Sequence, residues 1–380
     1  MSDPILPGAT LGVLGGGQLG RMFAAAAKRM GYRVAVLAPG EDGPTAQFAD
    51  FVFPAAYDDL DAVERFARAS DAVTLEFENV PTAAAETAAR HAPVRPSAQV
   101  LHATQNRLRE RELLDRLDLP SARHAPVLTE ADLEEAVRRV GAPAVLKSAS
   151  TGYDGKGQRK VERPEDALAL WDELERQPCL YEAFVPFEIE LSVVGARAHD
   201  GTLALYEPSR NDHVDHILDV SVVPGGFANG VATRTHDLAA AVFEGLELVG
   251  VACVEMFLLE DGSLLVNEIA PRPHNSGHLT IEATATSQFE AQVRAVAGLP
   301  LGATERLAGG AAMTNLLGDL WQNGTPDWAA ALAHPAVRLH LYGKDAALPG
   351  RKMGHLTATA DTPEEAERRV RAARAALTSR

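Results

Sequence analysis

The chain is poor in the features that mark secreted, membrane-spanning or nucleic-acid-binding proteins. Its 380 residues include only two cysteines, Cys179 and Cys253, and both stand in apolar or strand-like sequence. This setting favours reduced core residues over a disulfide or a metal site. No apolar run reaches the ~18 residues of a spanning helix, and the N-terminus lacks a basic stretch ahead of an apolar one. We therefore expect a cytoplasmic protein without a membrane segment.

Positive charge is scarce as well. Lysine and arginine total 36 against 52 acidic residues, a formal net charge of −16, and no basic cluster interleaved with aromatics offsets it. Such a field repels nucleic acid, so we expect no nucleic-acid partner. An anionic small substrate would need a locally basic pocket. With 46% hydrophobic and 23% charged residues, the chain is an ordinary globular protein of two or three domains.

Hydrophobic patterning predicts an α/β region followed by an α+β region. Short apolar runs alternate with amphipathic stretches before residue 80, which is typical of βαβ units and a parallel sheet. A further helix is expected from the cap Ser97 to about Leu117. Predicted strands cover 10–14, 33–37, 72–75, 144–147, 180–184, 188–195, 203–206 and 337–342, and predicted helices cover 20–30, 60–69, 238–248 and 363–377.

A glycine-rich turn, Gly15-Gly-Gly-Gln-Leu-Gly20, follows the first predicted strand and opens a helix. Backbone amides in such a turn can hold a phosphate at the helix N-terminus. The dinucleotide interpretation also needs an acidic residue at the end of the second strand, and that strand ends in Ala38-Pro39. The pattern therefore disfavours a nicotinamide cofactor, and a tight turn that only packs helix on sheet remains an alternative.

A second glycine-rich segment, 148–158, directly follows a strand that ends in Lys147. Its three glycines, Gly152, Gly155 and Gly157, let the backbone approach a polyphosphate closely, and Lys147 and Lys156 supply positive charge. The segment does not match a Walker A loop. A flexible hairpin with incidental lysines is the alternative.

Two apolar runs flank Asp261-Gly262, a strong hairpin signal. If these two residues form the loop, paired residue numbers have a constant sum, and Glu255 lies directly opposite Glu268. Cross-strand neighbours on one face have Cβ atoms ~5 Å apart. The register also predicts that Phe257, Leu259, Leu264 and Val266 share that face.

Two carboxylates that face each other in an apolar setting should not both stay ionised unaided. A divalent cation would neutralise them, and Mg²⁺ commonly takes one or two protein carboxylates together with nucleotide phosphates. A solvent-exposed hairpin edge, or one carboxyl with a raised pKa, would also relieve the repulsion.

Two loops could supply donors to an anion. The segment 271–278, with Arg272, His274 and Asn275, leaves the strand that carries Glu268 and is delivered to the same place. The second loop, 342–355, carries Lys344 and Arg351 in an otherwise acidic protein. The alternative for 271–278 is a loop that only leads out of the strand, and the alternative for 342–355 is a solvated turn.

The sequences of these motifs resemble those of the N5-carboxyaminoimidazole ribonucleotide synthetase family of the ATP-grasp superfamily. The resemblance spans residues 11 to about 356 and is carried by the segments 15–22, 74–80, 151–158, 267–278 and 349–355. It implies an ATP-grasp fold with a Rossmann-like parallel-sheet domain at 1–105, an ATP-grasp module at 106–308 and a small C-terminal domain at 309–380. The lid subdomain would cover about 120–186, and the metal and substrate subdomain about 187–308.

The resemblance also implies a site, residue by residue. ATP would contact Arg107, Lys147, Gly152, Tyr153, Asp154, Gly155, Lys156, Gly157, Gln158, Glu182, Ala183, Phe184, Val185, Glu190, His213, Asn267 and Glu268. Mg²⁺, with Mn²⁺ as a possible substitute, would bind Glu255 and Glu268. Aminoimidazole ribonucleotide would contact Gln18, Leu19, Glu76, Asn79, Lys344 and Arg351. Arg272, His274, Asn275, Lys156, Tyr153 and Asp154 would act in catalysis.

The implied reaction is phosphoryl transfer from ATP to bicarbonate, followed by delivery of carbon dioxide to the amine of aminoimidazole ribonucleotide. Family members are commonly homodimers, so a homodimer is expected here too. Three departures from the family pattern are Arg210 in place of a glutamate, His216 in place of a glycine, and Ala270 where many ATP-grasp ligases carry a metal-binding asparagine.

Other functions are weighed against this one. A formate-dependent glycinamide ribonucleotide transformylase shares the nucleotide and magnesium machinery, and only its acceptor site differs. A nicotinamide oxidoreductase is disfavoured because Ala38 stands where an acidic residue would bind the ribose. A nucleotide-binding regulatory protein without turnover is disfavoured because Glu255 and Glu268 are retained.

Overall fold

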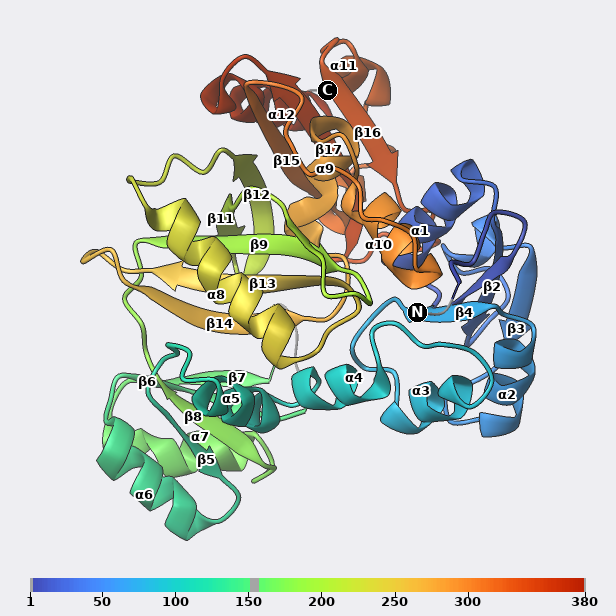
Figure 1. Ribbon diagram of the computed structural model, residues 1–380. Helices are drawn as coiled ribbons and strands as arrows, with labels where there is room; N and C mark the ends of the chain where they lie inside the picture. The colour runs from blue at the N-terminus through green and yellow to red at the C-terminus, as the bar shows by residue number, and fades with distance from the viewer. Residues whose placement is uncertain (1–2, 151–156, 379–380) are drawn as a thin grey trace.

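The computed structural model describes residues 3–150 and 157–378, and three sheets organise this part of the chain (Figure 1). The first sheet belongs to the N-terminal region, the second to a small subdomain, and the third runs through the centre of the molecule to the C-terminal region. The second and third sheets carry many of the charged residues described below, and helix α5 contacts both of them.

The N-terminal sheet is parallel, with strand order β3-β2-β1-β4. The βαβ pattern predicted from the sequence is confirmed, although β3 lies in a stretch for which no strand was predicted. Its elements are β1 (Thr10–Leu14), α1 (Gln18–Arg29), β2 (Arg33–Ala38), η1 (Ala46–Phe48), β3 (Phe51–Pro54), α2 (Leu60–Arg68), β4 (Ala72–Leu75) and α3 (Thr82–Ala89).

The single helix predicted from Ser97 to Leu117 is wrong, because the structure has two helices there: α4 (Ala98–Thr104) and α5 (Arg107–Arg116). Ser97 caps the first as expected, accepting a hydrogen bond from the Val100 amide. Asn106 caps the second by accepting from two backbone amides. An asparagine favours this capping role over a helix interior, which explains the interruption.

The second sheet is antiparallel, with strand order β5-β8-β6-β7, and two helices cover it. Its core contains Cys179, Tyr181 and Trp171. The elements are β5 (His124–Val127), α6 (Glu130–Val140), β6 (Ala144–Ser148), β7 (Gln158–Val161), η2 (Pro164–Asp166), α7 (Ala167–Glu173) and β8 (Cys179–Ala183).

The third sheet has the strand order β14-β13-β9-β11-β12-β15-β17-β16, with β10 paired to β9. It runs across the domain boundary expected at residue 309, because β15 pairs with β12. Its strands are β9 (Ile189–Arg197), β10 (Leu203–Leu205), β11 (Ser209–Val214), β12 (Ile217–Val223), β13 (Gly250–Leu258), β14 (Leu264–Ala270), β15 (Gly310–Leu317), β16 (Val337–Leu341) and β17 (Lys352–Ala360).

Helices cover this sheet and join it to the N-terminal sheet. Helix α8 packs its apolar side on β13 and β14 through Val242 and Phe243, so the opposite face of these two strands is left for polar residues. Helix α10 packs against α1, where Phe23 and Phe289 belong to one buried cluster. The helical elements are α8 (Val231–Gly245), η3 (Asn275–Leu279), α9 (Thr280–Ala283), α10 (Gln288–Ala297), η4 (Gly318–Trp321), α11 (Trp328–Leu332) and α12 (Pro363–Ala376).

Both cysteines are buried and free of disulfides, as the sequence predicted. Within residues 3–150 and 157–378, no helix has the length and apolar character that crossing a membrane requires.

Candidate active site

The hairpin β13–β14 brings Glu255 and Glu268 directly opposite each other, as predicted from the sequence. The prediction rested on a two-residue loop, and this part is wrong. The Leu259 amide donates to the Ser263 carbonyl across a three-residue loop in which Gly262 has φ +80°. Pairing near the loop is therefore shifted by one residue, and a β-bulge at Asn267 restores the predicted register at Glu255.

The bulge also changes which residues share a face with the two carboxylates. Leu264 and Val266 were expected beside them, but both pack into the apolar cluster on the α8 side. Phe257, two residues from Glu255 on the regular strand, does lie on the carboxylate side, where it stacks on Phe187 at 4.5 Å between ring centroids. An inserted residue in β14 reverses the alternation of side chains beyond it, which accounts for the difference.

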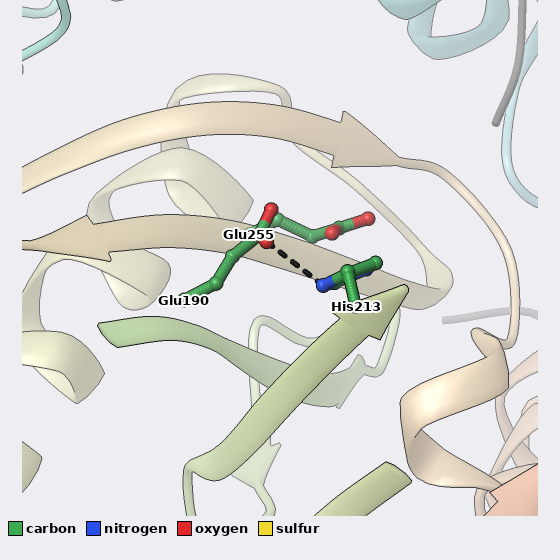
Figure 2. Close-up of side chains that lie close together, drawn as sticks. All are labelled: Glu190, His213 and Glu255. Carbon is green, nitrogen blue, oxygen red and sulfur yellow. Dashed lines mark ion pairs between the residues drawn. The ribbon is translucent and has the colours of Figure 1, made fainter. Parts of the chain in front are cut away.

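Glu255 forms a tight cluster with Glu190 of β9 and His213 of β11 (Figure 2). One potential ligand atom from each of the three lies within 4.8 Å of the others. The His213 Nδ1 atom is 2.8 Å from a Glu190 carboxylate oxygen. Burial acts to lower the pKa of His213, but the two neighbouring carboxylates, Glu190 first, raise it above its ordinary value.

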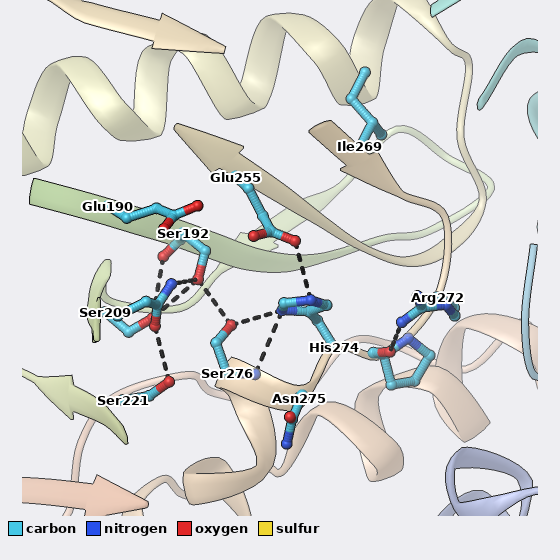
Figure 3. Close-up of polar contacts among 12 residues, drawn as sticks. Glu190, Ser192, Ser209, Ser221, Glu255, Ile269, Arg272, His274, Asn275 and Ser276 are labelled. Carbon is cyan, nitrogen blue, oxygen red and sulfur yellow. Dashed lines mark hydrogen bonds and ion pairs between the residues drawn. The ribbon is translucent and has the colours of Figure 1, made fainter. Parts of the chain in front are cut away.

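His274 lies on the other side of Glu255, 3.0 Å from its carboxylate (Figure 3). Burial opposes ionisation of both groups. The pKa of His274 is nevertheless raised, by Cys253 and by the Glu255 carboxylate. The pKa of Glu255 falls to about 2, because the charge and hydrogen bond of His274 outweigh its burial. Both shifts favour an imidazolium paired with a carboxylate.

A chain of hydroxyl groups holds His274 in place. Its Nδ1 atom is 2.9 Å from the Ser276 hydroxyl, which is 2.7 Å from the hydroxyl of Ser192. Ser192 in turn accepts from the Asn211 amide, and Ser209 and Ser221 complete the network (Figure 3). These side chains come from β9, β11, β12 and η3, so four segments fix the orientation of one ring.

Arg272 forms an ion pair with Glu78, which follows β4 in the N-terminal region. Two guanidinium nitrogens contact the two carboxylate oxygens, and the Nη2 to Oε1 distance is 2.9 Å. Burial alone would raise the pKa of Glu78, but the Arg272 charge lowers it to about 2. The pair joins the N-terminal sheet to the loop after β14, which brings the two sequence motifs together.

Glu268 differs from Glu255 because its side chain is open to solvent. The protein atoms around it still reduce its hydration, and this desolvation raises the pKa of Glu268, with the Glu255 charge as a second cause. Among the described residues, no positive side chain contacts the Glu268 carboxylate as closely as His274 contacts that of Glu255. A cation between the two carboxylates would relieve the repulsion.

Lys147 and Glu182 meet where β6 pairs with β8. The lysine ammonium is 2.5 Å from one carboxylate oxygen, and the buried Arg111 of α5 contacts the other at 2.8 Å. Burial acts to raise the pKa of Glu182, but the charges of Lys147 and Arg111 lower it to about 2. Arg107, at the start of α5, donates to the Ser148 carbonyl and so lies beside the same strand.

Glu182→Gln should destabilise the protein at pH 7 by about 3 kcal/mol, because it leaves two buried cations without their carboxylate. A carboxyl with a lowered folded-state pKa contributes stability above its ordinary pKa, and this contribution is lost as pH falls through the folded value. The difference between the variant and the unmodified chain should therefore shrink as pH falls from about 4.5 toward 2. Urea unfolding at several pH values measures it.

The exposed Glu86 supplies the control, since Glu86→Gln should leave the free energy of unfolding within ~0.5 kcal/mol of the unmodified chain. A difference for Glu182→Gln that stays constant from pH 7 to 3 would contradict the ion-pair account.

The glycine turn 15–20 holds a carboxylate from its own chain at the position predicted for a phosphate. The Gly17 amide donates to Glu76 at 2.5 Å, and the buried Glu76 lies against Gly15 and Gly17, where a Cβ atom would clash with it. Burial is the main cause that raises the pKa of Glu76. Gln18 and Leu19 begin α1 beside this carboxylate. The turn therefore orients Glu76, and its glycines are needed for close approach.

Lys344 and Arg351 lie on the loop between β16 and β17. The Lys344 ammonium donates to the Lys352 carbonyl at 2.6 Å, and its charge acts on Glu76. The Arg351 guanidinium donates to the Ala346 carbonyl at 2.9 Å. Asn79 is exposed after β4. Gln47 of the N-terminal region donates to the Gly343 carbonyl at 2.8 Å, so the loop that carries Lys344 lies against that region.

The remaining predicted site residues divide into two groups. Gly152, Tyr153, Asp154, Gly155 and Lys156 lie outside the described residues. Gly157 and Gln158 precede and open β7, and the Gly157 carbonyl accepts from the Ser148 amide. Phe184 and Val185 follow Ala183 at the end of β8, and the Lys160 ammonium lies over the Phe184 ring. Asn275 exchanges hydrogen bonds with Asn315.

The three departures from the family pattern have structural explanations. Arg210 pairs with Glu367 of α12, on the side of β11 away from Asn211. His216 and Asp215 both have positive φ, at 65° and 49°, and form the two-residue turn between β11 and β12. Such a turn accepts residues other than glycine at some cost. Ala270 is buried and offers no ligand.

The sequence interpretation missed Glu78, Glu110 and Arg111 as site residues. Glu78 belongs to a motif that was recognised, but its partner Arg272 is distant in sequence. Glu110 and Arg111 sit in a helix rich in charge, where nothing in the sequence separates the buried residues from the solvated ones.

Three family models match consecutive parts of the chain. The ribonucleotide synthetase preATP-grasp domain matches residues 8–105, the ATP-grasp domain matches 112–289, and the phosphoribosylaminoimidazole carboxylase C-terminal domain matches 311–369. Together they account for the three regions in order.

The N5-carboxyaminoimidazole ribonucleotide synthase of Bacillus subtilis is 44% identical over 356 residues, which cover 93% of this chain and 92% of that protein. This chain belongs to the N5-carboxyaminoimidazole ribonucleotide synthase family. It is an ATP-grasp ligase of purine biosynthesis. The fold expected from the sequence, an ATP-grasp module between a parallel-sheet domain and a small C-terminal domain, is confirmed.

Solved structures of the family agree closely with this one. A synthetase solved as an ADP complex has a TM-score of 0.92 at 40% identity, covering 98% of both chains. The Aspergillus clavatus enzyme in complex with ADP and 5-aminoimidazole ribonucleotide has a TM-score of 0.87 at 33% identity, covering 97% of this chain and 98% of that one.

Proposed function

We propose that this chain carboxylates aminoimidazole ribonucleotide with ATP and bicarbonate, forming N5-carboxyaminoimidazole ribonucleotide, ADP and phosphate. The observation that carries the proposal is the pairing of Glu255 with Glu268 beside a loop, 271–278, that Glu78 joins to the N-terminal sheet. The Glu255–Glu268 pair suits a cation that also binds a triphosphate. The Glu78–Arg272 ion pair links the loop beside these carboxylates to a separate region proposed for the acceptor. Full-length similarity to enzymes of this name supports the same reaction.

The carboxylates fit Mg²⁺, with Mn²⁺ as an alternative. Hard oxygen donors from one or two carboxylates, completed by phosphate and water, are the usual magnesium ligands. Glu255 and Glu268 offer such donors on one face. Desolvation first, and the Glu255 charge second, raise the pKa of Glu268, and a cation would offset both. Bound there, the ion would neutralise phosphate charge during transfer. Ala270 offers no third ligand, so we assign the remaining positions to Asn267, phosphate or water.

For ATP, we propose contacts near the Lys147–Glu182 pair and along the inner strands. Lys147 and Arg107 lie where β6 ends and supply positive charge for phosphates. Glu190 and His213 lie next to Glu255, within reach of a nucleotide that shares the cation. The full set is Arg107, Lys147, Gly152, Tyr153, Asp154, Gly155, Lys156, Gly157, Gln158, Glu182, Ala183, Phe184, Val185, Glu190, His213, Asn267 and Glu268.

For the acceptor, we propose the region between the glycine turn and the β16–β17 loop. Glu76, held by the turn, lies within electrostatic reach of Lys344, so a polar ring and a phosphate could bind together there. Gln18, Leu19, Glu76 and Asn79 would contact the ribose and ring, and Lys344 and Arg351 would bind the 5′-phosphate.

The proposed chemistry needs positioning and charge more than a protein nucleophile. A bicarbonate oxygen attacks the γ-phosphorus, ADP leaves, and carboxyphosphate results. Carboxyphosphate then releases phosphate and carbon dioxide, and the amine of the ribonucleotide attacks that carbon and loses a proton, which the departing phosphate can accept. Arg272 and the His274 imidazolium offer positive charge beside this path, with Asn275, Lys156, Tyr153 and Asp154 as further catalytic candidates.

Lys344→Ala should raise the half-saturating concentration of aminoimidazole ribonucleotide by about 10-fold to 100-fold, as expected for a lost charge-assisted hydrogen bond to phosphate. The half-saturation for ATP should change little, because Lys344 lies outside the nucleotide region. Initial rates of ADP formation with each substrate varied, bicarbonate included, measure both effects.

Lys28→Ala, at an exposed lysine of α1, is the control and should leave both values unchanged. An unmodified chain that forms ADP without needing the ribonucleotide, or that uses formate and glycinamide ribonucleotide instead, would overturn the proposed function. An unchanged value in Lys344→Ala would remove only that residue from the site. A homodimer and a cytoplasmic location, both common in the family, complete the proposal.

A further inference from the structure

Helix α5 carries two of the most deeply buried charges in the described part of the chain. The side chains of Glu110 and Arg111 are each about 3% exposed. Charged residues are seldom buried this fully unless hydrogen bonds and opposite charges compensate for the lost hydration. The contacts of Glu110 and Arg111 therefore indicate their role.

Arg111 contacts two other segments, and its neighbour Glu110 on the same helix, with one guanidinium group. Its Nε and Nη2 atoms donate to one Glu182 oxygen at 2.9 and 2.8 Å, and its Nη1 atom donates to Glu110 at 3.0 Å. The Nη2 atom also donates to the Asn267 carbonyl at 2.7 Å. Glu182 belongs to β8 in the small sheet, whereas Asn267 belongs to β14 in the large sheet. One side chain thus bridges the small sheet and the large sheet.

Glu110 adds a second contact to the same strand, because its carboxylate accepts from the Ile269 amide at 2.8 Å. Strand β14 is the last strand of the large sheet in the described part of the chain, and on its outer edge the Pro120–Ser121 segment contacts it only at Val266. The bulge at Asn267 interrupts its pairing on the other edge. Glu110 and Arg111 therefore hold the backbone of the residue before Glu268 and of the residue after it. A bulged edge strand would otherwise be a loose support for a ligand.

We propose that Glu110 and Arg111 are positioning residues that set the Glu268 carboxylate for its cation and couple it, through Glu182, to the site proposed for ATP. The inference rests on the proposed function, in which Glu268 binds Mg²⁺ and Lys147 and Glu182 lie beside ATP. Neither residue touches substrate. Their effect on the reaction passes through the backbone of β14 and through the Glu182 side chain.

Arg111→Lys tests this directly. Lysine keeps the charge, but a single ammonium cannot reach Glu182, Glu110 and the Asn267 carbonyl together. The Mg²⁺ concentration for half-maximal velocity should rise by about 10-fold to 100-fold, as for other groups that orient metal ligands. Excess Mg²⁺ should restore most of the maximal velocity. Mn²⁺ binding with a non-hydrolysable ATP analogue, followed by electron paramagnetic resonance, should weaken by a similar factor without relying on turnover.

Arg116→Lys is the matched control, since Arg116 is an exposed arginine in the last turn of the same helix. It should leave the Mg²⁺ and Mn²⁺ dependence unchanged. Arg111→Lys with unchanged dependence on both ions overturns the inference, even if velocity falls, because a purely structural role lowers the amount of active enzyme without altering cation affinity.

Glu110→Gln keeps the inference testable if Arg111→Lys fails to fold. The amide oxygen can still accept from Ile269, but glutamine lacks the second oxygen that accepts from Arg111, so a smaller rise in the Mg²⁺ requirement is expected. No rise overturns the inference. An unmodified chain without Mg²⁺-dependent ADP formation would instead contradict the proposed function. Failure of the inference and failure of the proposed function are therefore distinguishable.

Discussion

Glu268→Gln is expected to lower the rate of ADP formation by more than about 100-fold, because groups that merely orient metal ligands already cost 10-fold to 100-fold when removed. Glutamine keeps the size of the side chain but removes the charge that, with Glu255, would hold the cation. The side chain is open to solvent and needs no buried partner, so the variant should fold normally. Steady-state rates with varied Mg²⁺ and a thermal unfolding curve measure both properties.

Glu260→Gln, at an exposed position on the loop of the same hairpin, is the matched control and should keep full activity. Removing divalent ions from the unmodified chain with a chelator should reproduce the loss, and adding Mg²⁺ back should reverse it. Magnesium-dependent turnover at a normal rate in Glu268→Gln would exclude Glu268 as a metal ligand and remove the main support for the proposed function.

Arg272→Lys is expected to lower product formation by about 100-fold, which corresponds to ~2.7 kcal/mol of transition-state stabilisation. The planar guanidinium can hold both Glu78 oxygens and still present its remaining N–H groups, whereas an ammonium acts as a point charge. We expect ATP consumption to fall less than carboxylation, because an ill-placed carboxyphosphate is lost to water. The ratio of carboxylated product to ADP measures this uncoupling.

Glu78→Gln should also lower the ratio of carboxylated product to ADP. The variant with both substitutions should lose less activity than the sum of the two single losses, because both substitutions break the same ion pair. Arg306→Lys is the control, because Arg306 also pairs with a glutamate, Glu207, but outside this group of residues. Equal losses of ADP and product in Arg272→Lys would contradict a role in carboxyl transfer.

Regular elements with strong periodicity were predicted well. The strands β1 and β4 have the predicted bounds, and α1, α2 and α12 differ from the predictions by only one or two residues at either end. Their apolar patterns are local and suffice to place them. Strand β3 was missed because it has only four residues and ends in a proline, which weakens a strand signal. The helix break at Asn106 was missed because a capping residue inside a charged stretch resembles a helix interior.

At the site, the pairing of Glu255 with Glu268 was correct although its derivation contained an error. The loop has one residue more than predicted, and the bulge at Asn267 adds one residue on β14, so the two deviations cancel at the carboxylates. They do not cancel for Leu264 and Val266, which face the core. Hairpin loop length can be read from local residues, but a bulge depends on what packs on each side of a strand.

Residue order alone was enough to indicate the family, the alternation of strands and helices, and the two carboxylates suited to a cation, because each depends on a short continuous pattern. Only the folded chain established that Glu78 meets Arg272, that Glu76 occupies the glycine turn, and that Glu110 and Arg111 hold the strand around Glu268. Each of these contacts joins segments remote in sequence, and burial decides whether a charge is paired or solvated, which no local pattern records.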